Sequence, residues 1–213
     1  ALRKEKDRWA SRAVIYNAFP RLTAAFDHDG NNVLGASQID MTLNEKGIRD
    51  SGTFLKMIAM LPYIQALGAD TLYLLPVNSI GKDARKGNLG SPYATSDLLA
   101  FDERLGDPLL DGMAVEDQFA ALVEAAHILG IRVVLEFALR TSAPDNVNAK
   151  EHPEWFYWIR REDAPNFSKP VFTPEELEKI KRIPEGGKDY IAPNENYREQ
   201  FVLPPKKGKI GIV

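Results

Sequence analysis

Residues 68–77, Gly-Ala-Asp-Thr-Leu-Tyr-Leu-Leu-Pro-Val, decide the fold class of this chain. The stretch before them, Thr53 to Leu67, has apolar residues at helical spacing, and Gly68 suits the end of a helix. The run from Thr71 to Val77 is almost continuously apolar, which is typical of a parallel strand buried on both faces. The sequence therefore predicts a helix that ends at a glycine and leads directly into a buried strand.

The same pattern occurs again further along the chain. A helical pattern from Val115 to Leu129 ends at Gly130, and Ile131 to Leu139 reads as the next strand. An earlier apolar run, Val14 to Phe19, predicts the first strand. Helices that alternate with buried strands favour an α/β fold with a parallel sheet. The segment from Asn78 to about Asp97 is expected to be a long polar loop at the end of a strand.

The chain changes character after Ser142. Residues 143–213 are rich in Pro, Gly, Lys, Glu and aromatic residues, and the clearest helix signal among them runs from Thr173 to Arg182. We therefore predict two regions. Residues 1–142 form the α/β part, and residues 143–213 form an inserted subdomain or an extended loop region.

Composition excludes several classes of site. The 213 residues carry a formal net charge of −3 and no cysteine, so disulfides, zinc–thiolate sites and thiol nucleophiles are excluded. Positive and negative charges are scattered along the sequence, which favours neither a nucleic-acid surface nor a membrane surface. No apolar run is long enough to span a bilayer. A cytoplasmic location is expected. Asp27, Asp29 and Asn31 have the alternate spacing of a calcium loop, but Gln38 stands where an acid is needed. A polar turn is the better interpretation, and no metal site is expected.

Three stretches together resemble the α-amylase superfamily, glycoside hydrolase family 13. They are residues 68–77, quoted above, residues 90–97 (GSPYATSD) with 101–107 (FDERLGD), and residues 126–137 (AHILGIRVVLEF) with 152–156 (HPEWF). The resemblance implies the first three or so βα units of a (β/α)8 TIM barrel. It also implies a retaining enzyme that acts on α-glucans or maltooligosaccharides, by hydrolysis or by maltosyl transfer.

Two departures from the family pattern point to a subgroup. Arg140 stands where the family usually has a calcium-ligating Asn, and Thr141 stands where it has a substrate-binding His. The run 136–142 (EFALRTS) and the loop sequence Arg85-Lys86-Gly87 are similar to the family's maltosyltransferases. This resemblance implies phosphate or maltose 1-phosphate as a further ligand.

The candidate substrate-binding residues follow from these motifs. The resemblance implies that Tyr93 forms a platform under a sugar ring, and an aromatic face suits that contact. Asp97 matches a family Asp, but it equally suits a turn or a helix cap. At Arg140, a cation at the end of a buried strand needs a partner, which is either Glu136 or an anionic ligand.

Arg85 and Lys86 lie in the glycine-flanked loop. They could bind a phosphate or a sugar hydroxyl, although solvated surface charge is the simpler interpretation.

The chemistry of the family requires a carboxylate nucleophile and a carboxylic acid. In the family these acids follow the fourth and fifth barrel strands, and no pair of carboxylates in these 213 residues fits the role. We therefore expect these residues alone to be catalytically inactive and to need no cofactor. The alternatives are a non-catalytic sugar-binding protein and a structural one. The open edges of a partial sheet also predict self-association.

Overall fold

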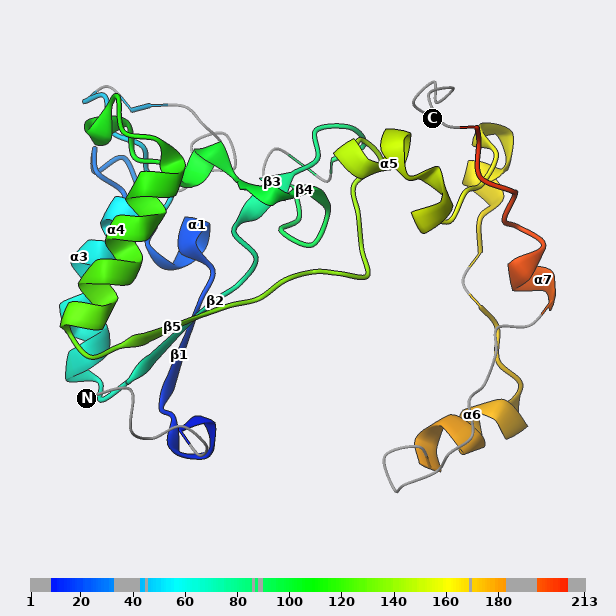
Figure 1. The fold of residues 1–213 in the computed structure, drawn as a ribbon, viewed down its shortest axis with the longest axis horizontal. Coiled ribbons are helices and arrows are strands. Elements are labelled where there is room, and N and C mark those ends of the chain that lie inside the picture. The colour runs from blue at the N-terminus through cyan, green and yellow to red at the C-terminus, as the bar shows by residue number, and fades with distance from the viewer. Residues whose placement is uncertain are drawn as a thin grey trace. The chain divides into compact units, whose positions relative to one another are not determined.

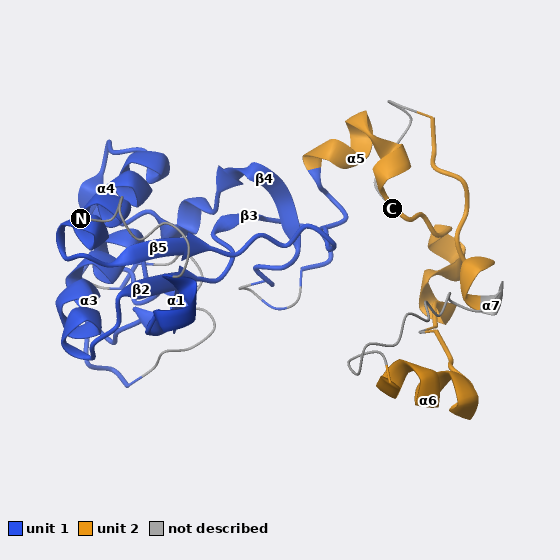
Figure 2. Cartoon of the chain, turned by 60° about the horizontal axis from the view of Figure 1, so that its bottom comes forward, with its two compact units in different colours: residues 1–146 blue, residues 147–213 orange. Residues whose placement is uncertain are grey.

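The chain divides into two compact units, residues 1–146 and 147–213 (Figure 2). The structure is a computed structural model and describes residues 9–32, 43–44, 46–85, 87, 90–168, 170–182 and 195–206. Near the start of the described residues, Ala10–Arg12 form a short 3-10 helix. That residues 143–213 are an inserted subdomain stays a prediction.

Three parallel strands form the main sheet of the first unit, in the order β1-β2-β5 (Figure 1). They are β1 (Ile15–Ala18), β2 (Thr71–Leu74) and β5 (Arg132–Leu135). Ala18 is in register with Leu74, and Leu74 with Leu135, so the three strands end together. The parallel sheet predicted from the sequence is confirmed.

Two strands are shorter than the sequence predicts. The second ends at Leu74 rather than at Val77, and Pro76 has no N–H for a ladder. The third ends at Leu135 rather than at Leu139. Phe137 and Leu139 are 49% and 77% exposed, so their apolar character does not mark a buried strand. Arg140 consequently lies five residues beyond the strand, and the expectation that it ends the strand is wrong.

Two long helices lie side by side along the sheet, α3 (Phe54–Ala66) and α4 (Val115–Ile128) (Figure 1). The hydroxyl of Thr53 caps α3 by accepting from the amide of Lys56 at 3.3 Å, and the helix continues through Pro62. Gly68 and Gly130, with φ of 81° and 76°, follow the two helices in the left-handed conformation that glycine adopts freely. Both predicted helices are confirmed.

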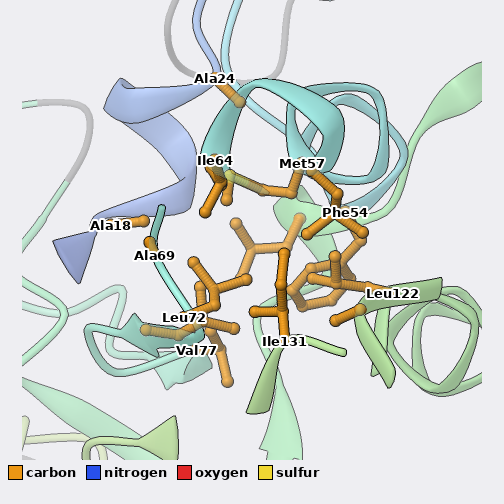
Figure 3. Packing of buried hydrophobic residues seen from close by; sticks show 14 residues of the cluster. Ala18, Ala24, Phe54, Met57, Ile64, Ala69, Leu72, Val77, Leu122 and Ile131 are labelled. Carbon is orange, nitrogen blue, oxygen red and sulfur yellow. The ribbon is translucent and has the colours of Figure 1, made fainter. Parts of the chain in front are cut away.

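The core of the first unit lies between these helices and the sheet (Figure 3). Every third or fourth residue of α3 is buried, and Leu72 and Leu74 of β2 are fully buried opposite them. Three rings pack beside this layer with centroids 4.7–6.0 Å apart, namely Phe54, Phe101 and Phe119. Burial of one apolar face of each helix therefore stabilises the packing of α3 and α4 on the sheet.

The segment expected to be a polar loop contains two strands. β3 (Asn78–Ile80) pairs antiparallel with β4 (Thr95–Phe101), and the amide side chain of Asn78 donates to Leu98 O at 2.8 Å. The loop prediction is therefore wrong over these residues, because the two ends of this long connection form strands that pair with each other. This two-stranded sheet carries the residues on either side of Tyr93.

A buried network of charged and polar groups fixes residues 102–107 to the rest of the unit. The guanidinium of Arg104 donates to both oxygens of Asp102 at 2.9 Å, and Arg21 lies 4.0 Å from the same carboxylate. Arg49 donates to the carbonyls of Arg104 and Gly106 at 2.8 and 3.0 Å. Burial lowers the pKa of Arg21 to about 10, against the raising effect of Asp102.

Short helices make up most of the described part of the second unit. They are α5 (Val147–Glu151), the 3-10 helices η4 (Pro153–Trp155) and η5 (Arg161–Asn166), α6 (Pro174–Arg182) and α7 (Glu195–Arg198). The predicted helix ending at Arg182 is confirmed. Thr173 and Glu176 form a capping box, with Thr173 N bonded to Glu176 at 2.7 Å and Glu176 N to Thr173 at 3.2 Å.

Trp158 and Val202 form an antiparallel bridge in this unit, and the ring of Phe201 packs against those of Tyr157 and Tyr197. Across both units, no described helix combines the length and the apolar character that crossing a membrane requires.

Candidate functional site

The candidate site lies where the three parallel strands of the first unit end. The amide of Leu75 donates to Ala18 O at 2.9 Å, and the amide of Glu136 donates to Leu74 O at 3.0 Å. These bonds join the residues at the ends of β1, β2 and β5. In α/β barrels, binding residues come from this edge and from the loops that follow it.

Glu136 lies at the centre of this edge, between two tyrosines. Tyr73 of β2 is paired with Val134, and Glu136 follows two residues later on the same face of the sheet. Hydrogen bonding with Glu136 raises the pKa of Tyr93, with further contributions from desolvation and from the negative charge of Glu136. Desolvation, followed by the hydrogen bond and the charge of Glu136, raises the pKa of Tyr73. The carboxylate therefore disfavours the phenolate form of both side chains.

Tyr93 is also tied to the segment after β5. The hydroxyl of Thr141 donates to Tyr93 O, so the residue at the family's histidine position supports the main chain of the tyrosine. The side chain of Tyr93 remains 39% exposed, which leaves ring surface for a ligand. The structure thus brings Tyr93 and Glu136 together, as their candidate roles require.

Arg140 is exposed beside Thr141. The ion pairs recorded within the described ranges do not include an Arg140–Glu136 pair. Of the two partners expected for Arg140, Glu136 is therefore not seen as an ion-pair partner, and Arg140 stands in an exposed loop. An anionic ligand stays the remaining prediction for this cation.

Asp97 belongs to β4, and its carboxylate bonds the main chain close to it in the sequence. Its carboxylate accepts from the amide of Leu99 at 2.8 Å, and Asp97 is in register with Ser79. This is the turn-type bond that the sequence allowed as an alternative. A contact between Asp97 and a sugar stays a prediction.

Arg85 is exposed, and its stem lies against the backbone of Gly90. A Cβ at Gly90 would lie 2.7 Å from both Cγ and Cδ of Arg85. The positive charge of Arg85 makes a small contribution to the lowered pKa of Arg21. Lys86 lies outside the described residues, so its role as a phosphate ligand stays a prediction.

The stretch from Asp27 to Asn32 forms the predicted polar turn. The carboxylate of Asp27 accepts from the amides of Gly30 and Asn32 at 2.8 and 2.7 Å, and the Asn32 bond is the main cause of the lowered pKa of Asp27. Oxygens of Asp27, Asp29 and Asp50 also lie within 4.8 Å of one another, a spacing compatible with a cation.

Two residues of the site were missed from the sequence. In the sequence, Tyr73 looks like one more apolar residue of a buried run. Because side chains alternate along a strand, however, Tyr73 points to the other face of the sheet from Leu72 and Leu74. Thr141 was noted only as a departure from the family histidine. Alternation within the strand could have identified Tyr73, whereas the bond from Thr141 to Tyr93 joins residues 48 positions apart and leaves no local pattern.

No family model matches the chain. Curated relatives include the α-1,4-glucan:maltose-1-phosphate maltosyltransferases of Mycolicibacterium smegmatis, 36% identical over 163 residues, and of Mycobacterium tuberculosis, 37% identical over 159 residues. Each match covers 70% of this chain and 20% of the relative. An α-amylase from Lactobacillus plantarum is similar in structure, with a TM-score of 0.51, 32% identity, and coverage of 77% of this chain and 30% of that chain.

The resemblance to the α-amylase superfamily is confirmed. The curated relatives agree with the predicted maltosyltransferase subgroup. The chain spans about a fifth of the length of these curated relatives.

Proposed function

We propose that this chain supplies part of the sugar-binding rim of an α-glucan maltosyltransferase that uses maltose 1-phosphate. The position of Tyr93 beside Glu136, at the shared end of the parallel strands, carries the proposal. The ring has exposed surface, its main chain is fixed by Thr141, and its phenol is fixed by a carboxylate. A rigid aromatic face with a hydroxyl at its edge is suited to a pyranose ring.

The charge of the residues near the rim favours a phosphorylated sugar as its ligand. A maltosyl phosphate presents an apolar sugar face together with a dianionic group, so its binding requires cations beside the aromatic platform. In this proposal the cations are Arg140, one residue before Thr141, and Arg85 of the loop before Tyr93, both exposed in the first unit. The names of the curated relatives support the same pair of substrates.

Glu136 is proposed to position Tyr93 rather than to react. A carboxylate that interacts with two phenols is poorly placed to attack a glycosidic carbon, and the retaining mechanism needs a second acid about 5 Å from the first. In this proposal the rim contributes orientation and affinity, and bond cleavage depends on acids outside the rim.

The proposal is tested by calorimetric titration of the chain with maltose 1-phosphate and, separately, with maltose. Arg140→Gln and Arg85→Gln are expected to weaken the binding of maltose 1-phosphate about tenfold each while changing the binding of maltose little, because only the phosphate contact is lost. Arg161→Gln, which changes an exposed cation of the second unit, is the control. Equal loss for both ligands, or no binding of maltose 1-phosphate, would contradict the proposal.

A further inference from the structure

Trp155 of η4 is an exposed aromatic surface in the second unit. Its side chain belongs to the large apolar residues in contact with solvent and is 65% exposed, although tryptophan is usually well buried. The chain's other tryptophans, Trp9 and Trp158, are half-buried. Trp158 is engaged through its indole N–H, which donates to Pro153 O at 2.7 Å. Trp155 therefore has more ring surface available to a ligand than either of the other two tryptophans.

The ring of Trp155 is held in one orientation. The imidazole of His152 stacks on it, with ring centroids 3.9 Å apart and an angle of 6° between the planes. The amide of Trp155 donates to His152 O at 3.0 Å, and Pro153 stands between the two residues. One face of the indole is thus covered by the imidazole, and the opposite face is left for contact with another molecule. A fixed ring loses little freedom on binding.

Polar groups adjoin this aromatic surface. Nδ1 of His152 lies 3.2 Å from the carboxylate of Glu154, and both side chains remain about half exposed. A ligand for the site should therefore combine an apolar face with hydroxyl groups at its edge. A pyranose ring has this chemistry: its axial C–H groups stack on an indole, and its equatorial hydroxyls donate to carboxylates.

We propose that Trp155, backed by His152 and flanked by Glu154, is a second carbohydrate contact of this chain, separate from the rim around Tyr93. Its ligand is a glucose unit of an α-glucan chain. The choice of an α-glucan rests on the proposed function, whereas the platform itself rests only on the geometry of η4. The contact binds the glucan without participating in any chemical step.

The test uses the complete 213-residue chain labelled with ¹⁵N and titrated with maltoheptaose. The three indole N–H signals are assigned with the Trp→Phe variant of each tryptophan. The Trp155 signal is expected to shift in a saturable manner, while the Trp9 and Trp158 signals move little. Cellohexaose, which presents a different chain geometry, is expected to shift the Trp155 signal less.

Calorimetry with maltoheptaose then compares three variants. Trp155→Ala is expected to weaken this binding event at least about fivefold, the change that corresponds to the loss of one aromatic stacking contact. His152→Ala is expected to weaken it less, because the ring stays but its backing is lost. Trp9→Phe, a change at a tryptophan of the first unit, should leave the affinity unchanged.

Two results would overturn the proposal: a Trp155 signal that does not respond to maltoheptaose, or an affinity that survives Trp155→Ala. The titration with maltose 1-phosphate, read at Tyr93, separates this failure from failure of the proposed function. A response at Tyr93 without one at Trp155 overturns only the second contact. A response at Trp155 without one at Tyr93 supports the second contact and contradicts the proposed rim.

Discussion

Glu136 disfavours the phenolate form of Tyr93, the tyrosine on which the proposed sugar contact depends. Hydrogen bonding with this carboxylate, followed by desolvation and charge, raises the pKa of Tyr93. Loss of a phenolic proton would place a second negative charge beside Glu136, so the protonated form is favoured. Tyr93 is therefore expected to keep its hydroxyl proton to higher pH than an ordinary tyrosine.

Glu136→Gln is expected to lower the pKa of Tyr93 toward its usual value, since it removes the hydrogen bond from the phenol to the carboxylate and, with it, the negative charge that opposes the phenolate. The measurement is a pH titration of the Tyr93 ring carbon signal by NMR. Asp83→Asn, a change at an exposed carboxylate of the same unit, should leave this titration where it is. An unchanged Tyr93 titration in the Glu136→Gln variant would show that the two groups do not interact.

Asp102 holds two buried guanidinium groups, and its removal leaves both without their carboxylate. Asp102→Ala is expected to lower the free energy of unfolding by about 3–5 kcal/mol, the usual cost of stranding a buried charge. Urea unfolding followed by circular dichroism measures the loss. Asp83→Ala, at an exposed residue, should cost no more than about 0.5 kcal/mol. Similar losses for the two variants would contradict the structural role given to Asp102.

At the scale of elements, α1 (Pro20–Thr23) and the start of α3 approach so closely that only glycine fits between them. A Cβ on Gly52 would lie 1.9 Å from Pro20 O, and the amide of Gly52 donates to Arg21 O at 2.8 Å. Gly52→Ala is expected to cost about 3 kcal/mol, near the upper end for overpacking, because main-chain atoms cannot move aside as side chains can.

Thermal unfolding of Gly52→Ala and of Gly112→Ala tests this account of the junction. Gly112 has open space around its would-be Cβ but a φ of 85°, so its substitution should cost only about 1–2 kcal/mol through backbone strain. A smaller loss at Gly52 than at Gly112 would rule out the steric explanation.

Helices were easier to predict from the sequence than strand ends. Both helices show buried residues at helical spacing and a glycine after the last turn, and these signals lie within a short stretch of sequence. Exposed apolar residues such as Phe137 and Leu139 carry the same hydrophobicity as buried ones, so the end of β5 depends on tertiary contacts. The pairing of β3 with β4 likewise arises from contacts about 20 residues apart along the chain.

The candidate site shows the same limit. Motif resemblance identified Tyr93 and Glu136, because they stand in residues 90–97 and 126–137, two of the stretches that resemble the family. The contacts between them, and the support from Tyr73 and Thr141, depend on the register of three strands and on the return of a long loop. Residue types could be predicted from the sequence, whereas the partners of each residue could not.

At the scale of the whole molecule, the described sheet is open on both sides. β1 and β5 each pair with β2 alone, and Val14 and Ile15 beside the free edge of β1 are 53% and 55% exposed. Self-association through such edges stays a prediction. The sequence expectation of a partial barrel agrees with the three parallel strands, and the α-amylase of similar structure covers 77% of the chain.

The central claim is that the rim at the ends of these strands binds a maltosyl ligand through Tyr93. The most direct measurement follows the Tyr93 ring signals of the complete chain by NMR during titration with maltose 1-phosphate. We predict a saturable shift of these signals and, in the Tyr93→Ala variant, a loss of calorimetric affinity for the same ligand of at least about fivefold. Unperturbed Tyr93 signals, or equal affinity in the variant, would contradict the claim.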